Sequence, residues 1–191
     1  MKLKNKYYIM RHGQAISNVK SFCSNWPEKF HNPLTKLGRK MVKDSAEKLK
    51  KKNPIIDSIF CSPLLRTRQT AGIAGKIFRA KSKTDRRLKE INFGKFNGKN
   101  LEGMWKSFKR EEMRINKGAD GGETYRQVLG RMMDFVKETE KKYKGKTILI
   151  ISHEGPLFLL QGKVMGLSFK ETIKKFPLKE RIHKSEIRQL K

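Results

Sequence analysis

Residues 6–14 read KYYIMRHGQ, an apolar run that ends in an Arg-His-Gly triplet. The apolar residues predict a buried strand, and Gly13 lets the backbone turn sharply just after it. Ligands of open α/β sheets bind beyond the carboxyl ends of the strands, which is where Arg11 and His12 would lie. Arginine pairs with phosphate oxygens through parallel hydrogen bonds, and a neutral imidazole nitrogen can attack phosphorus. The triplet alone fits a phosphoryl-binding site and a solvated strand end equally well.

A second stretch repeats this pattern near the end of the chain. Residues 147–156 read TILIISHEGP, a strongly apolar run followed at once by His153, Glu154 and Gly155. The run predicts a buried strand of a parallel sheet, with a helix after it. A single histidine at a strand end is more often structural. Two of them, each followed closely by a glycine, indicate a common site.

The middle of the chain adds arginines to this candidate site. Residues 55–61 (IIDSIFC) predict another buried strand, and Ser62-Pro63 predict the N-cap and first residue of a helix. Arg66 and Arg68 fall in the first turns of that helix, where free amides and the helix dipole favour an anion. Helical spacing does not decide which of them points inward, and for Arg68 a surface position is the preferred interpretation.

Two other polar residues are candidates for the same site. Asn18 follows soon enough after the triplet for its amide to reach a group held by Arg11 and His12, although a turn or helix cap is the simpler interpretation. Glu90 lies in a loop of residues 89–98 that contains glycines and aromatic residues. In so basic a chain it would normally be a salt-bridge partner, yet burial beside aromatic rings would raise its pKa enough for it to donate a proton.

Strand and helix patterns alternate along the chain. This predicts an α/β fold, a three-layer α/β/α sandwich with a mostly parallel central sheet. The length predicts one domain, residues 1–191, in which residues 95–122 form a small lid insertion. Within that insertion, residues 99–117 predict a short helix with Arg114 on its polar side. Residues 184–191 predict a closing edge strand.

The charge is strongly positive, because 46 Lys and Arg stand against 18 Asp and Glu, a formal net charge of +28. Such a surface attracts anions. A nucleic-acid footprint and a lysine-biased proteome both explain the charge. The second is favoured, since the lysines are spread along the chain and aromatic residues are not interleaved with them. Weak non-specific polyanion binding is expected.

The cysteines and the hydropathy of the chain indicate its cellular location. Cys23 and Cys61 have neither metal-ligand spacing nor the density of a secreted disulfide scaffold, which favours a cytoplasmic protein. The longest apolar stretches are too short to span a bilayer, so no membrane partner is expected. The chain has no P-loop and no acidic cluster of magnesium-binding character, so neither a metal nor a cofactor is expected. The sequence does not indicate an oligomeric state.

Together these motifs resemble the histidine phosphatase (phosphoglycerate mutase-like) superfamily. The family's opening Arg-His-Gly with a later Asn matches residues 11–13 and Asn18, and its Ser-Pro-x-x-Arg-x-x-x-Thr-Ala motif matches residues 62–71. Its Leu-x-Glu-Ile-x-Phe-Gly segment matches residues 88–94, Gly-Gly-Glu-Thr matches residues 121–124, and the closing Ser-His matches Ser152 and His153. The motifs come in the family's order and span most of the chain.

The resemblance implies a mechanism and roles for these residues. His12 would be the nucleophile that forms a phosphohistidine. Arg11, Arg66 and His153 would hold the phosphoryl oxygens, and Asn18 would contact the phosphate.

The resemblance also bears on the general acid, and the chain departs from the family's pattern at two positions. Glu90 would protonate the leaving oxygen and then help water to attack, whereas Glu123 would be a supporting or substrate-proximal residue. Glu154 stands where the family commonly has glycine, which places a side chain near the pocket, although its backbone amide is still expected to contact phosphate. Asn97 stands where the family often has glutamate, so the role of acid depends on Glu90 alone.

The expected function is that of a metal-independent phosphomonoesterase acting on a phosphorylated small molecule. Three alternatives remain open: mutase-type phosphoryl transfer, polyanion binding on a retained phosphatase fold, and a phosphoprotein as the substrate. The family's cofactor-dependent mutases have a longer segment between the acid and the second histidine, so the short segment of this chain favours the phosphatase.

Overall fold

The computed structural model describes residues 2–52 and 54–191. Its strands are β1 Lys6–Arg11, β2 Ser58–Cys61, β3 Ser82–Thr84, β4 Thr147–Ser152 and β5 Ile187–Gln189. Its α-helices are α1 Ile16–Lys20, α2 Lys36–Lys50, α3 Leu65–Phe78, α4 Leu101–Lys106, α5 Tyr125–Lys142, α6 Glu154–Val164 and α7 Phe169–Lys175. Short 3₁₀ helices are η1 Arg86–Leu88, η2 Gly94–Phe96, η3 Glu111–Ile115 and η4 Leu178–Glu180.

The strands form one sheet in the order β3-β2-β4-β1-β5. The first four of these pair in parallel, and β5 runs antiparallel along the edge of β1. In the register, Arg11 lies beside Ser152 and Cys61 lies beside Ile151, so β1, β4 and β2 end at the same edge of the sheet. The predicted mostly parallel sheet and the closing edge strand are confirmed.

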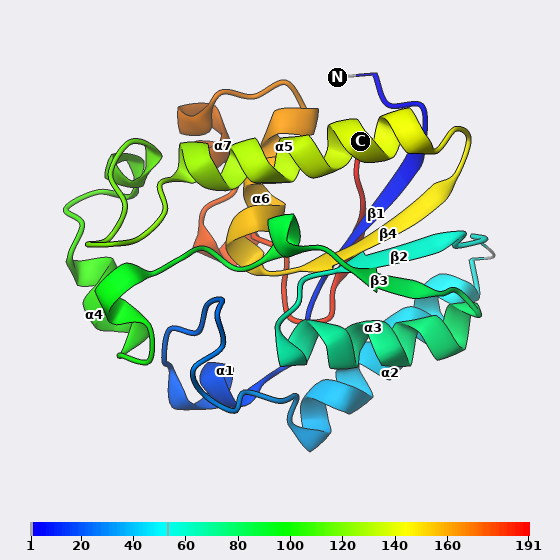
Figure 1. Cartoon of the computed structure of the whole chain (residues 1–191), viewed down its shortest axis with the longest axis horizontal. Helices are drawn as coiled ribbons and strands as arrows, with labels where there is room; N and C mark the ends of the chain where they lie inside the picture. The colour runs from blue at the N-terminus through cyan, green and yellow to red at the C-terminus, as the bar shows by residue number, and fades with distance from the viewer. Residues whose placement is uncertain (1, 53) are drawn as a thin grey trace.

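Helices cover both faces of this sheet, with α2 and α3 on one side and α5 and α6 on the other (Figure 1). Side chains of β1 point alternately to the two faces of the sheet, and each face packs against its own layer of helices. Tyr7 packs in the apolar cluster that includes Met132 of α5, whereas Tyr8 packs in the cluster that includes Val42 of α2. Successive residues of a strand point to opposite faces, so each face of the sheet binds its own pair of helices. The three-layer sandwich is therefore confirmed.

The start of α3 differs from the prediction that Ser62 caps it. The helix begins at Leu65, and Leu64 is its N-cap residue. The Ser62 hydroxyl is instead 2.8 Å from Nε2 of His153, on the neighbouring strand end. The prediction placed the helix too early because Ser-Pro is a common helix start, whereas here the serine side chain is engaged in a contact between strand ends.

Residues 95–122 form several short pieces rather than the helix predicted over 99–117. Helix α4 ends at Lys106, and a separate 3₁₀ helix begins at Glu111. Arg114 belongs to this second piece and is only 4% exposed. Its predicted place on a polar helix face is therefore wrong, because helical spacing cannot be carried across a break in the helix. The lid and the single domain stay predictions.

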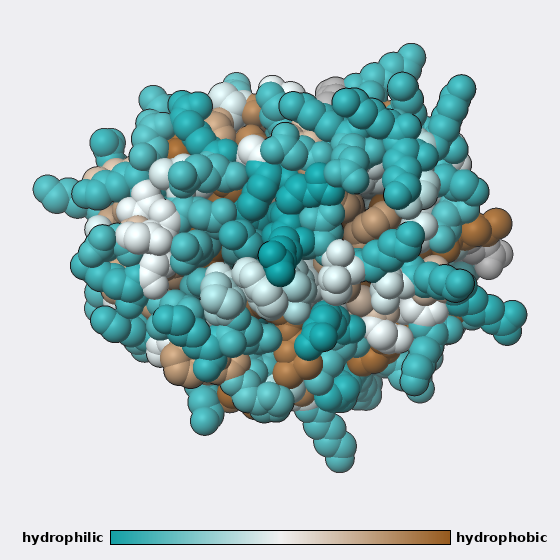
Figure 2. Space-filling model, in the orientation of Figure 1, coloured by the Kyte–Doolittle hydropathy of each residue, from teal (hydrophilic) through white to brown (hydrophobic). Residues whose placement is uncertain are grey.

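The surface is as polar as the composition suggests. Hydrophilic side chains cover most of the face in Figure 2. Across residues 2–52 and 54–191, no helix is both long and apolar enough to cross a membrane.

Candidate active site

The two histidines meet at the edge where the parallel strands end. His12 directly follows β1 and His153 directly follows β4, and these strands are paired neighbours. The centroids of the two imidazole rings are 5.1 Å apart, with the rings inclined at 63°. The expected convergence of these distant segments is confirmed.

The hydrogen bonds of His12 fix its tautomer. Its Nδ1 lies 2.7 Å from the carbonyl oxygen of Gly13, which only accepts, so Nδ1 carries the proton. Nε2 lies 3.1 Å from Nε of Arg66, which only donates, so Nε2 carries the lone pair. Burial, reinforced by the charge of Arg66, lowers the pKa of His12 well below its usual value. The ring is therefore neutral near pH 7, with a nucleophilic nitrogen.

Arg66 joins the two histidines. Its Nε donates to His12, its Nη2 donates to Nδ1 of His153 at 3.1 Å, and Nη2 also donates to the carbonyl oxygen of Ser24 at 2.9 Å. The side chain is buried, and burial lowers its pKa to about 10, so it remains a cation at neutral pH. Arg68, two residues further along α3, is exposed, which agrees with the surface position preferred for it from the sequence.

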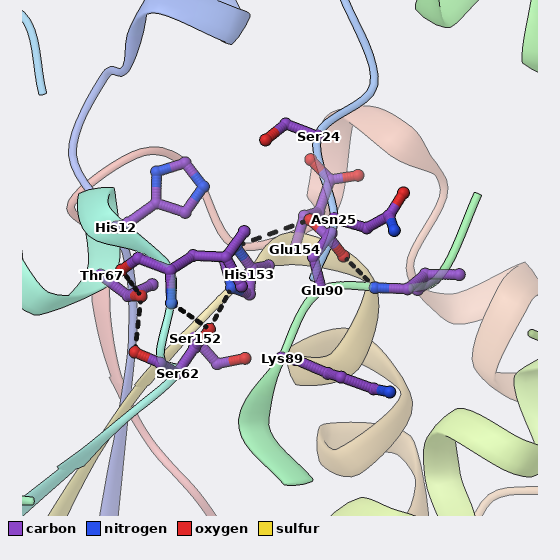
Figure 3. A network of polar contacts seen from close by, with 12 residues as sticks. His12, Ser24, Asn25, Ser62, Thr67, Lys89, Glu90, Ser152, His153 and Glu154 are labelled. Atoms are coloured by element: carbon purple, nitrogen blue, oxygen red, sulfur yellow. Dashed lines mark hydrogen bonds and ion pairs between the residues drawn. The ribbon is translucent and has the colours of Figure 1, made fainter. Parts of the chain in front are cut away.

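His153 has the opposite tautomer to His12. Its Nδ1 accepts from Arg66, so the proton is on Nε2, which donates to the Ser62 hydroxyl at 2.8 Å (Figure 3). Burial and the neighbouring Arg66 charge lower the pKa of His153 well below its usual value. His153 is fully buried and does not line the pocket. It contacts two residues that do line it, Arg66 and Glu90.

Glu90 comes from the loop after η1 and points at the same cluster (Figure 3). Its Oε2 is 3.7 Å from Nδ1 of His153, and its Oε1 accepts from the amide of Ile91 at 2.9 Å. Because His153 is neutral, the contact between them is not an ion pair. Burial raises the pKa of Glu90, and Arg66 opposes that shift without cancelling it. A carboxyl group of this kind keeps its proton to higher pH than an exposed one.

Arg11 and Glu154 face each other across the ends of β1 and β4. Nη1 of Arg11 donates to Oε2 of Glu154 at 2.6 Å and to the carbonyl oxygen of Ile182 at 3.1 Å. Nε of Arg11 is buried and has no hydrogen-bond partner among the described residues. Buried donors are nearly always satisfied, so this unpaired N–H is unusual. The side chain that Glu154 places near the pocket is thus paired with Arg11.

A pocket of about 100 Å³ opens beside these side chains. Its wall includes the following residues predicted from the sequence: Arg11, His12, Asn18, Arg66, Glu90 and Glu154. The side-chain Oδ1 of Asn18 accepts from the backbone amide of Ala15 at 2.9 Å, so Asn18 is a local turn residue as well as a pocket residue. Contact of Asn18 with phosphate stays a prediction.

Glu123 and Asn97, the two other residues compared with the family's pattern, lie outside the pocket wall. Glu123 forms an ion pair with Arg131 at 2.9 Å and accepts from the amide of Asn92, which makes it a supporting residue as expected. Asn97 accepts from the amide of Asn25 at 3.2 Å and does not line the pocket.

The sequence analysis did not assign several residues of the pocket region to the site. Arg181, Arg114 and Tyr125 line the pocket, and Glu28 lies 3.6 Å from Arg66. Arg181 and Glu28 belong to segments without periodicity, and Tyr125 occupies a helix position that looks like ordinary core. Sequence spacing contained no signal for them.

Comparison with known proteins gives one family over most of the chain. The model of the histidine phosphatase superfamily (branch 1) matches residues 7–182. "Probable phosphoglycerate mutase GpmB" of Photorhabdus laumondii is 26% identical over 165 residues, which are 84% of this chain and 74% of that protein. Phosphoserine phosphatase 1 of Hydrogenobacter thermophilus is 24% identical over 143 residues, 72% of this chain and 67% of that protein.

Solved structures share the fold. A mycobacterial glucosyl-3-phosphoglycerate phosphatase in complex with VO3 superposes with a TM-score of 0.81 at 22% identity, covering 96% of this chain and 91% of that one. YhfR of Bacillus stearothermophilus superposes with a TM-score of 0.74 at 22% identity, covering 88% of this chain and 83% of that one.

Proposed function

Because the chain belongs to the histidine phosphatase superfamily, we propose that it is a phosphomonoesterase that works through a phosphohistidine on His12, without a metal. The observation that carries this proposal is the state of His12: a buried, neutral imidazole whose proton is held by Gly13 and whose lone pair lies beside Arg66. Arginines supply the positive charge that a transferring phosphoryl group requires. The enzyme would thus be an acid phosphatase-type hydrolase.

In the first step, Nε2 of His12 attacks phosphorus, a P–N bond forms, and the P–O bond to the leaving group breaks. Nε of Arg66 now donates to Nε2, so a phosphoryl oxygen takes over that donor as the substrate binds. Arg11, which also lines the pocket, adds positive charge beside the phosphoryl oxygens. Glu90, whose pKa is raised by burial, acts in its protonated form and gives its proton to the leaving oxygen.

In the second step, the Glu90 carboxylate takes a proton from water. The oxygen of that water attacks phosphorus, the P–N bond breaks, and the lone pair returns to Nε2 of His12. His153 acts mainly through Arg66, whose guanidinium it holds by a hydrogen bond of 3.1 Å. The amide of Glu154, in the first turn of α6, is free of an intrahelical partner and is proposed to donate to the phosphoryl group.

Phosphate release distinguishes a phosphatase from a mutase. We expect 3-phosphoglycerate mixed with 2,3-bisphosphoglycerate to give free phosphate in the presence of EDTA, with little isomerisation, because the segment between Glu90 and His153 is short. A colorimetric phosphate assay and chromatography of the products measure both rates. Rapid isomerisation with little free phosphate would show a mutase, and loss of activity in EDTA that added metal restores would remove the metal-free mechanism.

We expect Glu90→Gln to separate substrates by their leaving groups. For an alkyl phosphate, kcat/KM should fall by roughly 10²- to 10⁴-fold, because the alkoxide then leaves without a proton. For 4-nitrophenyl phosphate, whose leaving group needs no proton, kcat/KM should change little. Breakdown of the phosphoenzyme should be slow with both substrates, and with 4-nitrophenyl phosphate stopped-flow absorbance would record this as a burst of nitrophenolate.

The pH profile gives the matching test. In the wild type, kcat/KM for an alkyl phosphate should fall as the pH rises through the Glu90 pKa, which burial places above the usual 4.5. His12 and His153 remain neutral in mild acid, so activity should persist there. Glu90→Gln should remove the alkaline fall. An unchanged profile in Glu90→Gln would assign the acid to another group.

The partners and location remain proposals. A phosphorylated small molecule suits the small pocket, and weak polyanion binding by the +28 surface stays a prediction. Cys23 and Cys61 are buried and unpaired, which supports a reducing, cytoplasmic setting.

A further inference from the structure

Arginines dominate the charge of the pocket wall, and all but one of them lie near a carboxylate. The pairs are Arg11 with Glu154 at 2.6 Å, Arg66 with Glu28 at 3.6 Å, and Arg181 with Glu111 at 2.6 Å. Arg114 also lines this pocket, and none of the described residues forms an ion pair with it. The positive charge that the protein leaves uncompensated in the pocket is therefore that of Arg114.

Aromatic rings surround the Arg114 guanidinium. Its central carbon is 4.7 Å from the ring centroids of Trp105 and Tyr125 and 5.5 Å from that of Phe108. The residue is 4% exposed, so few water molecules can reach it. Cation–π contacts offset part of the lost hydration, but they leave the N–H groups in the plane of the guanidinium without acceptors.

The position of Arg114 is fixed by a hydrogen-bond relay. The Tyr125 hydroxyl donates to Oε1 of Glu111 at 2.5 Å and accepts from Nη1 of Arg114 at 3.1 Å. Glu111 in turn accepts two hydrogen bonds from Arg181. The other nitrogens of Arg114 have no hydrogen-bond partner among the described residues, and they are not sealed from the pocket.

Arg114 is separate from the groups that would hold the transferring phosphoryl. It forms no hydrogen bond or ion pair with His12, Arg66 or Glu90 within the described chain, and it comes from η3 rather than from a strand end. A rigidly held, dehydrated guanidinium with free N–H groups is the form of an anion-binding residue.

We propose that Arg114 determines specificity by binding a second anionic group, a carboxylate or a further phosphate, on the substrate whose phosphoester lies at His12. This inference rests on the proposed phosphatase function. Arg114 holds the far end of the substrate and takes no part in bond breaking. The preferred substrates are accordingly small phosphomonoesters that carry an additional negative charge.

Substrates that differ only in that group test the proposal. Glycerol 3-phosphate has a neutral hydroxymethyl group where 3-phosphoglycerate has a carboxylate and glycerol 1,3-bisphosphate has a second phosphate. The wild type should prefer at least one of the two anionic substrates by about 10- to 100-fold in kcat/KM. Arg114→Gln should abolish that preference, mainly by raising KM for the anionic substrate that the wild type prefers. Which anionic substrate loses its advantage identifies the carboxylate or the phosphate as the ligand.

Arg110→Gln is the matched control, because Arg110 is an exposed arginine of the same segment, and it should keep the wild-type preference. Arg114→Met replaces Arg114→Gln if the glutamine variant does not fold, since methionine retains apolar contact with the rings. A wild type without preference, or a preference that survives loss of Arg114, would overturn the inference while the phosphatase stands. Absence of phosphate release from every substrate would overturn the phosphatase proposal itself.

Discussion

His12→Ala should lower phosphatase activity by roughly 10⁴-fold or more with every substrate, because the variant has no atom to accept the phosphoryl group. The neighbouring His153 cannot substitute for it. Its Nδ1 lone pair accepts from Arg66, and its Nε2 carries a proton that is donated to Ser62. Steady-state assays with 4-nitrophenyl phosphate and with an alkyl phosphate measure the loss.

The fold should survive this change, since alanine removes a side chain from the edge of the sheet and not from its apolar core. Thermal unfolding followed by circular dichroism checks the fold of His12→Ala. His31→Ala, which changes an exposed histidine, is the matched control and should keep full activity. Activity that persists in a pure, folded His12→Ala preparation would remove the nucleophile from the mechanism.

Arg66→Lys should lower kcat/KM by roughly 10²- to 10³-fold with every substrate, although the charge is retained. One guanidinium now donates to Nε2 of His12, to Nδ1 of His153 and to the carbonyl oxygen of Ser24. A lysine ammonium cannot reach all three acceptors with the same planar geometry, so at least one buried acceptor loses its donor. Kinetics on an aryl phosphate measure the effect.

Arg68→Lys is the control for this experiment, because Arg68 lies on the same helix but is exposed. It should leave kcat/KM unchanged. We expect the melting temperature to fall in Arg66→Lys and to stay constant in Arg68→Lys, since only Arg66 satisfies buried acceptors. Near-normal kcat/KM in Arg66→Lys would mean that the planar fork is not what binds the phosphoryl group.

The parts of the site that lie at strand ends could be predicted from the sequence. Apolar runs before His12 and His153 predict buried parallel strands, and parallel strands bring their carboxyl ends to one edge. The meeting of these two rings follows from that geometry and needs no further information. Arg66 could be placed near them because a helix follows the strand, although its inward direction required the packed structure.

The other side of the pocket could not be predicted, because loop contacts and breaks in helices determine it. Periodicity assigned Arg114 to a polar helix face, but the α-helix ends at Lys106 and Arg114 belongs to a separate 3₁₀ helix that begins at Glu111. The ion pair of Arg181 with Glu111 joins residues far apart in sequence, and neither belongs to a motif. Such pairings depend on tertiary packing and leave no local pattern.

The most direct test of the phosphohistidine mechanism is to trap the intermediate. Glu90→Gln mixed with 4-nitrophenyl phosphate, quenched with alkali and digested, should yield a peptide that carries one phosphoryl group on His12, which is lost in mild acid as expected for a P–N bond. The double variant with His12→Ala should give no such peptide. Steady phosphate release from Glu90→Gln with no phosphoryl group on His12, or with one on another residue, would contradict the mechanism.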